Sequence, residues 1–122
     1  MEPLEIRIRL AEIVGFTWAN GGTRIGYSDM GPLAGQIPER YVGRALTLEE
    51  LPPFESSLNL LRWIQINCID TDVRKALFHG HLASYVYQGQ NDGLSAYAKI
   101  TQIPAIKMAE MILRTFEIWD EE

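Results

Sequence analysis

The spacing of apolar residues along the chain changes between its first half and its second half. Residues 4–14 (LEIRIRLAEIV) alternate partly like a strand, but their apolar side chains also share one face of a helix. We favour the helix because Gly15 follows it directly, and glycine commonly terminates helices. The first element is therefore predicted to be a helix that ends at Gly15.

No helical period is present between Phe16 and Leu51. The stretch from Phe16 to Tyr41 holds five of the ten glycines and two of the six prolines of the chain. Glycine and proline disfavour a long helix, and the runs 23–27 and 40–48, bounded by glycines, are typical of short strands joined by turns. Pro52 and Pro53 end this irregular segment.

Helical spacing returns after these prolines. A helix capped by Ser56 or Ser57 is predicted to run to about Asn67. Apolar residues cover most of its circumference, which predicts burial at the centre of the domain or at a subunit interface. A second helix, capped by Asp70 or Thr71, is predicted to continue to residue 87.

The remainder of the chain is expected to contain a turn, a short strand and a final helix. Residues 88–93 (QGQNDG) are typical of a turn, and residues 94–100 (LSAYAKI) fit a short strand. Thr101 is expected to cap the last helix, with Pro104 in its first turn. That helix has an apolar stripe and an opposite charged side, whose spacing suits surface ion pairs. The charged residues are Lys107, Glu110, Arg114 and Glu117.

Composition and length predict one globular domain over residues 1–122, with 47% hydrophobic and 22% charged residues. The expected fold class is α+β, with a small antiparallel sheet in the glycine-rich half and about four helices. A net charge of -5 argues against general binding of nucleic acid polymers. With a single cysteine, no signal peptide and no apolar run long enough for a membrane span, we expect a cytoplasmic protein.

Catalytic and metal-binding motifs are not apparent in the sequence. His79 and His81 lie two residues apart on a predicted helix and point in different directions, so no metal site is expected. Cys68 falls on an apolar stripe, which favours packing over nucleophilic chemistry. We therefore expect neither an enzyme nor a cofactor.

Aromatic residues and arginines occur together in the irregular half. This set could stack on a base and hold phosphate oxygens, although aromatic core residues with solvated arginines are the simpler interpretation. Its members are Phe16, Trp18, Arg24 and Tyr27, followed by Arg40, Tyr41 and Arg44.

Two stretches resemble a family of small phage and prophage proteins of the phage ABA-sandwich type. Residues 51–61 (LPPFESSLNLL) are similar to the start of that family's central helix, and residues 109–122 (AEMILRTFEIWDEE) are similar to its closing helix. Residues 100–106 (ITQIPAI) depart from the family's usual start of the last helix. Members with an assigned role include Thoeris anti-defence proteins of phages.

The resemblance implies a non-catalytic sponge that sequesters a cyclic ADP-ribose signal, or another cyclic nucleotide, made by a bacterial TIR enzyme. It also implies a homodimer or larger homo-oligomer with pockets between subunits. We accordingly expect stacking of adenine on Trp18 or Phe78, amide recognition by Asn91, and phosphate pairing by a basic side chain. The basic candidates are Arg24, Lys107 and Arg114.

Each of these residues also has a structural alternative. Phe78 could belong to the core, Asn91 could only shape its turn, and Lys107 could belong to a solvated helix face. Two other functions stay open: a protein that blocks a host partner through an apolar patch, and a small phosphohydrolase.

Overall fold

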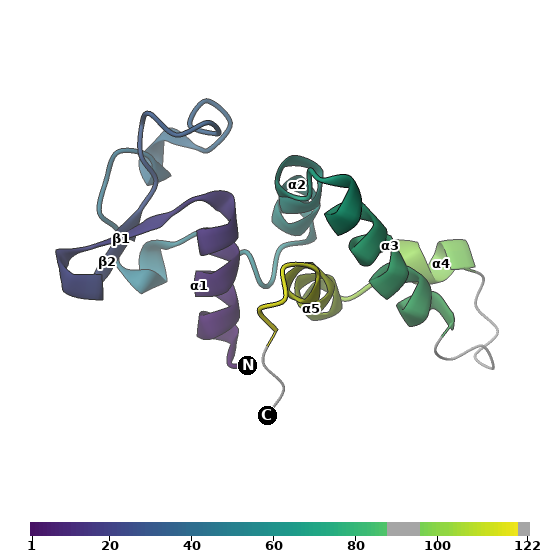
Figure 1. The fold of residues 1–122 in the computed structure, drawn as a ribbon. Coiled ribbons are helices and arrows are strands. Elements are labelled where there is room, and N and C mark those ends of the chain that lie inside the picture. Colours follow the sequence, from purple (N-terminus) through teal and green to yellow (C-terminus); the bar gives the residue numbers. More distant parts are fainter. Residues whose placement is uncertain (88–95, 120–122) are drawn as a thin grey trace.

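A computed structural model describes residues 1–87 and 96–119 of the chain (Figure 1). Within these residues the protein forms five α-helices and one two-stranded antiparallel sheet, which is the predicted α+β class. The helices are α1 (Pro3–Val14), α2 (Leu58–Cys68), α3 (Asp72–Tyr87), α4 (Ala96–Thr101) and α5 (Ala105–Thr115). The strands are β1 (Thr17–Ala19) and β2 (Arg24–Gly26).

The first segment is helical, as predicted. Pro3 stands in the first turn of α1, where its missing N–H costs no helical hydrogen bond. Gly15 ends the helix in the left-handed conformation with φ 119°, and its N–H donates to the Ala11 carbonyl at 3.1 Å. The apolar face of α1 is buried, which explains why the helical pattern prevails over the strand pattern.

The glycine-rich half contains less regular structure than predicted. β1 and β2 form a hairpin in which Trp18 pairs with Ile25. The run 40–48 was predicted to be a strand, but it makes only isolated bridges, from Leu46 to Ile25 and from Val42 to Tyr27. Gly43, with φ 72°, interrupts the extended conformation between these bridges. Short 3-10 turns at Glu39–Tyr41 and Leu48–Glu50 flank the interrupted run.

The structure confirms the predicted positions of helices α2 and α3. The Ser57 hydroxyl accepts a hydrogen bond from the Leu60 N–H at 3.3 Å, and the Thr71 hydroxyl accepts one from the Arg74 N–H at 3.2 Å. α2 is less buried in the single chain than its composition predicted. Leu61 and Ile64 are its fully buried side chains, whereas Ile66 is 76% exposed.

The C-terminal part corrects two predictions. Residues 96–101 form the short helix α4, where a strand was predicted. Thr101 is the last residue of α4 and therefore does not cap α5, which begins after Pro104. The predicted turn at 88–93, including Asn91, lies outside the described residues.

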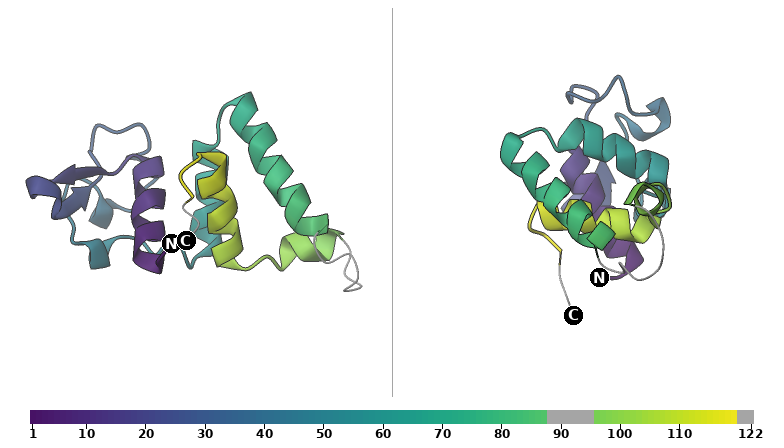
Figure 2. Two further views of the ribbon diagram at one scale, coloured as in Figure 1. Left: turned by 60° about the horizontal axis from the view of Figure 1, so that its bottom comes forward. Right: turned by 90° about the vertical axis from the view of Figure 1, so that its right-hand side faces the viewer.

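The helices follow one another across the molecule, with α5 placed between α1 and α3 (Figures 1 and 2). α1 packs against α2 and α5 on one side and carries the hairpin and the irregular loops on the other (Figures 1 and 2). α5 in turn packs against α3, so α3 and α4 occupy the end opposite the hairpin (Figure 2). The buried side chains form a hydrophobic core that extends from the loops to α3. Across residues 1–87 and 96–119, no helix is both long enough and apolar enough to span a membrane.

Candidate aromatic binding site

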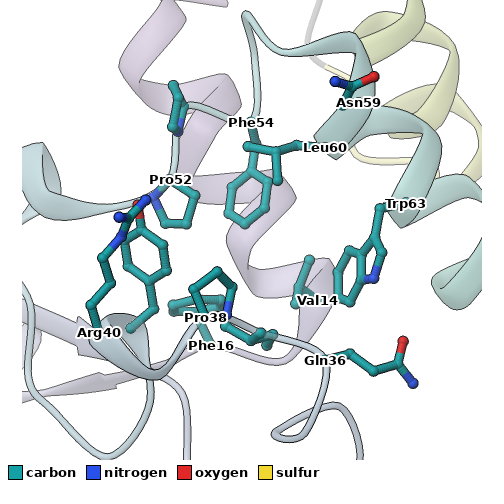
Figure 3. A pocket seen from close by; sticks show the side chains of 13 residues that line it. Val14, Phe16, Gln36, Pro38, Arg40, Pro52, Phe54, Asn59, Leu60 and Trp63 are labelled. Atoms are coloured by element: carbon teal, nitrogen blue, oxygen red, sulfur yellow. The ribbon is translucent and has the colours of Figure 1, made fainter.

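A hollow of about 490 Å³ lies between the irregular loops and the start of α2 (Figure 3). Its wall is mainly apolar and includes four aromatic rings. This volume falls within the range of small-molecule sites, about 300–1,000 Å³. The lining residues are Val14, Phe16, Gln36, Ile37, Pro38, Arg40, Tyr41, Pro52, Pro53, Phe54, Asn59, Leu60 and Trp63.

The buried wall of the hollow depends on two tight chain reversals. The left-handed Gly15 turns the chain out of α1 and places Phe16 directly in the core, where it is 3% exposed. The two prolines before Phe54 produce a second turn, in which the Phe54 N–H donates to the Pro52 carbonyl at 2.8 Å. The Phe16 and Phe54 rings then meet edge to face with their centroids 6.2 Å apart.

The opposite wall is the loop from Ser28 to Pro38. Tyr27 is buried below it, and the Tyr27 hydroxyl accepts a hydrogen bond from the Leu33 N–H at 2.8 Å. The Leu33 carbonyl in turn accepts from the Ile37 N–H at 3.2 Å. These bonds hold the loop so that Gln36, Ile37 and Pro38 face the hollow.

Polar groups lie at the rim of the hollow. The Arg40 guanidinium stands over the Tyr41 ring at 4.8 Å from its centroid. In Figure 3 the Phe54, Pro52 and Pro38 rings are gathered in the middle, and the amides of Gln36 and Asn59 are at the periphery. The arrangement suits a flat apolar ring in the centre, with hydrogen-bonding or anionic substituents at the edge.

An ion pair joins α1 to the segment that follows Phe54. The Arg7 Nε lies 3.1 Å and 2.9 Å from the two carboxylate oxygens of Glu55. Both side chains are mostly buried, with 22% and 10% exposed. The hydrogen bonds to Glu55 raise the pKa of Arg7, which favours its charged guanidinium form.

The predicted residues Trp18 and Arg24 lie in the hairpin, outside the lining of the hollow. Trp18 pairs with Ile25 and Arg24 pairs with Ala19, so the two side chains project from opposite faces of the hairpin. The Trp18 indole N–H donates to the Glu12 carboxylate at 3.4 Å. The Arg24 guanidinium pairs with Glu50 at 3.8 Å.

The other described candidates lie at the helical end. Phe78 is 1% exposed and belongs to the core, which is the structural alternative for this residue. Lys107 and Arg114 are brought together in a polar hollow of about 240 Å³ between α3 and α5. Glu110 stands between them, 4.0 Å from the Lys107 Nζ and 3.3 Å from the Arg114 Nε, so its carboxylate offsets their charge.

The structure therefore does not bring the six predicted residues into one site. Asn91 lies outside the described residues, and the other five divide between the hairpin, the core and the α3–α5 hollow. Of the aromatics and arginines noted in the sequence, Phe16, Arg40 and Tyr41 do line the aromatic hollow.

Sequence reasoning missed Phe54 and Trp63 as site residues. Phe54 follows two prolines that signalled only the end of the irregular half. Trp63 widens the apolar stripe of α2, and its side chain is only partly buried in the core. This surplus of apolar surface on α2 was the feature of the sequence that could have indicated a binding surface. The sequence predicts that such a helix is buried in the core or at a subunit contact; in the structure Leu61 and Ile64 are buried, while Leu60 and Trp63 line the hollow.

Cys68 and the histidines make up the remaining candidate chemistry. Burial raises the pKa of the Cys68 thiol to about 11, which favours the unreactive thiol form at neutral pH. Within the described residues, no group of three or more histidine, cysteine or acidic side chains is arranged to hold a metal ion.

Comparisons with models of protein families, with curated proteins and with solved structures found no match to this chain.

Proposed function

We propose that this protein is a phage-type anti-defence protein that binds a nucleotide signalling molecule of the cyclic ADP-ribose class and sequesters it without cleaving it. The observation that supports this proposal is the aromatic hollow itself. The partly exposed rings of Tyr41 and Trp63 provide apolar faces for a base, the buried Phe16 and Phe54 rings form the floor beneath them, and Arg40 provides a positive charge at the rim.

A sponge needs several such contacts at once, because micromolar affinity already corresponds to about 8 kcal/mol of binding free energy. Stacking of one base on aromatic side chains contributes about 1–3 kcal/mol, and a charge-assisted hydrogen bond contributes about 1.5–3 kcal/mol. The lining offers rings, aliphatic carbons, amides and one guanidinium. Apart from the Tyr41 hydroxyl, the described lining includes no histidine, cysteine, lysine or carboxylate to serve as a general base or nucleophile, which favours binding over hydrolysis.

The test is calorimetric titration of the purified protein with the glyco-cyclic ADP-ribose isomers, followed by recovery of the ligand. Saturable binding with intact ligand is the expected result. Recovery of an altered product would replace the sponge with a phosphohydrolase. Absence of heat at saturating concentrations, with the protein folded, would contradict the proposal and favour the partner-blocking function.

Two matched tryptophan variants locate the site. Trp63 lines the hollow and is half-buried, whereas Trp18 is 40% exposed on the hairpin and was the candidate from the sequence. Trp63→Leu keeps much of the apolar volume but removes a stacking face, so we expect affinity to fall by about tenfold. Trp18→Leu should bind like the wild type. The reverse pattern would move the site to the hairpin.

The proposed homo-oligomer is tested by combining the stoichiometry from these titrations with light scattering. Light scattering with and without ligand gives the mass of the particle that binds. We expect a dimer or larger assembly in which the stoichiometry is one ligand per hollow. A monomer that binds one ligand would leave the sponge intact and remove the intersubunit pockets.

A further inference from the structure

Three arginines extend from the rim of the aromatic hollow toward the hairpin. Arg40 lines the hollow, and the Arg44 Nη1 donates to the Arg40 carbonyl at 3.4 Å. The Arg44 Nη2 then lies 3.6 Å from one carboxylate oxygen of Glu50, and the Arg24 Nη1 lies 3.8 Å from the other. A single carboxylate thus stands between two guanidinium groups beside the hollow.

Glu50 is held in this position independently of the arginines. It closes a capping box, in which its Oε1 accepts from the Thr47 N–H at 3.0 Å and from the Thr47 hydroxyl at 2.9 Å. These two bonds are the main reason why the pKa of Glu50 is lowered, and the two arginines lower it further. The carboxylate is therefore charged at neutral pH and fixed in place.

The arginines, by contrast, are available to a ligand. The side chains of Arg24 and Arg44 are 42% and 58% exposed, and both separations from Glu50 exceed the length of a hydrogen bond. Their planar donor groups match the oxygens of a phosphate. Two other acidic residues neighbour this cluster in the chain. Glu39 precedes Arg40 in the same 3-10 turn, and Glu49 precedes Glu50 and attracts the Arg7 guanidinium electrostatically.

We propose that Arg40 and Arg44, supported by Arg24, form a phosphate subsite for a ligand whose aromatic ring occupies the adjoining hollow. Glu50 occupies the anion position in the free protein and competes with the incoming phosphate for Arg44. This inference rests on the proposed function, because it assigns the phosphate end of the same ligand. It places that end beside the hairpin, away from Lys107 and Arg114.

The experiment compares adenosine, AMP and inorganic phosphate as calorimetric ligands of the full chain at low and high salt. AMP should bind about tenfold more tightly than adenosine, because it adds charge-assisted hydrogen bonds to the ring contacts. The advantage should shrink at high salt, since these arginines are exposed. Phosphate alone should bind far more weakly than AMP.

Two variants with opposite expected effects test the arginines directly. Arg44→Gln should abolish the advantage of AMP and leave adenosine binding unchanged. Glu50→Gln should increase the affinity for AMP several-fold, because it removes the competing charge while glutamine still suits the capping box. Arg9→Gln is the charge-matched control, since Arg9 is exposed on α1 and pairs with Glu12 at 3.1 Å. It should behave like the wild type.

The outcomes separate this inference from the proposed function. Equal binding of adenosine and AMP would overturn the subsite and leave the aromatic site intact. Lack of binding by both, in a preparation that still binds the glyco-cyclic ADP-ribose isomers, would overturn the subsite alone, whereas loss of binding by all of these ligands would contradict the proposed function itself. Weaker AMP binding by Glu50→Gln would show that Glu50 supports the arginines rather than competing with the ligand. Phosphate bound as tightly as AMP would indicate a free-phosphate site that is independent of the hollow.

Discussion

The two ends of this molecule are held together by different physical means. At the helical end, α3 and α5 pack along their apolar faces, and the outward side of α3 meets no other part of the described chain closely. At the hairpin end, the segment from Phe16 to Ser57 has little regular structure and depends on single contacts. The aromatic hollow lies at the end that depends on these contacts.

A comparison of two glycines makes the difference concrete. A Cβ atom on Gly26 would overlap the carbonyl oxygen of Arg44, whereas one on Gly80 would meet nothing within 4 Å. The first glycine allows two backbone segments to approach closely, and the second lies in the exposed middle of a helix. Glycine is thus required at position 26, whereas at position 80 it only lowers the stability of the helix slightly.

The largest effect is expected from Gly26→Ala. The added methyl group would push Arg44 away from β2 and break the bridge between Ile25 and Leu46. In that bridge the Ile25 N–H donates to the Leu46 carbonyl at 3.0 Å, and the Leu46 N–H donates to the Ile25 carbonyl at 2.8 Å. We expect the free energy of unfolding to fall by about 3 kcal/mol, measured by urea denaturation. A loss below about 1 kcal/mol would show that the two segments separate easily, and that the hairpin end is less tightly determined than proposed.

A smaller loss is expected from Arg7→Gln. This change leaves the mostly buried Glu55 carboxylate without its partner, and we expect a loss of about 2 kcal/mol in the same denaturation measurement. Arg9→Gln removes an exposed pair with Glu12 on the same helix, so its effect should stay within about 0.5 kcal/mol. Equal losses for the two variants would mean that burial of the Arg7 pair adds no stability.

The loop that faces the hollow is tested by Tyr27→Phe. The hydroxyl is the acceptor for the Leu33 N–H, and its removal should cost about 1–2 kcal/mol by leaving that donor without its protein partner. Ligand affinity should fall as well, because the loop carries Ile37 and Pro38 into the lining. Tyr87→Phe, at a position 67% exposed on α3, is the matched control and should be neutral. Unchanged affinity in Tyr27→Phe would show that the hollow forms without this bond.

The same contrast explains how much the sequence could predict. α1, α2, α3 and α5 follow from local signals, namely apolar spacing of 3.6 residues, Ser57 and Thr71 as caps, and Gly15 as a terminator. The run 40–48 is predicted to be a strand because it lacks a helical period and belongs to the short runs bounded by glycines. It fails as a strand because Gly43 adopts a positive φ, and that conformation depends on a contact to Tyr27 from another part of the chain.

The candidate site was less predictable than the fold for a similar reason. Arg40 and Tyr41 are neighbours in the sequence, so their pairing could be anticipated. Phe16, Phe54 and Trp63 converge from three separate segments, and no local spacing encodes their meeting. Lys107 and Arg114 did fall together as expected from one helix face, but Glu110 on that face neutralises much of their charge.

The smallest effect, and one of opposite sign, is expected from Gly80→Ala. The space around Gly80 is open and its helical backbone suits alanine, so the change should raise the free energy of unfolding by about 1 kcal/mol. Ligand affinity should not change, because Gly80 lies on α3, which occupies the opposite end of the molecule from the hollow. The measurement pairs urea denaturation with calorimetry on the same preparation. A destabilised Gly80→Ala would mean that a neighbour, such as a second copy of the chain, packs closely on this face of α3. The helical end would then depend on close backbone contacts, as the hairpin end does.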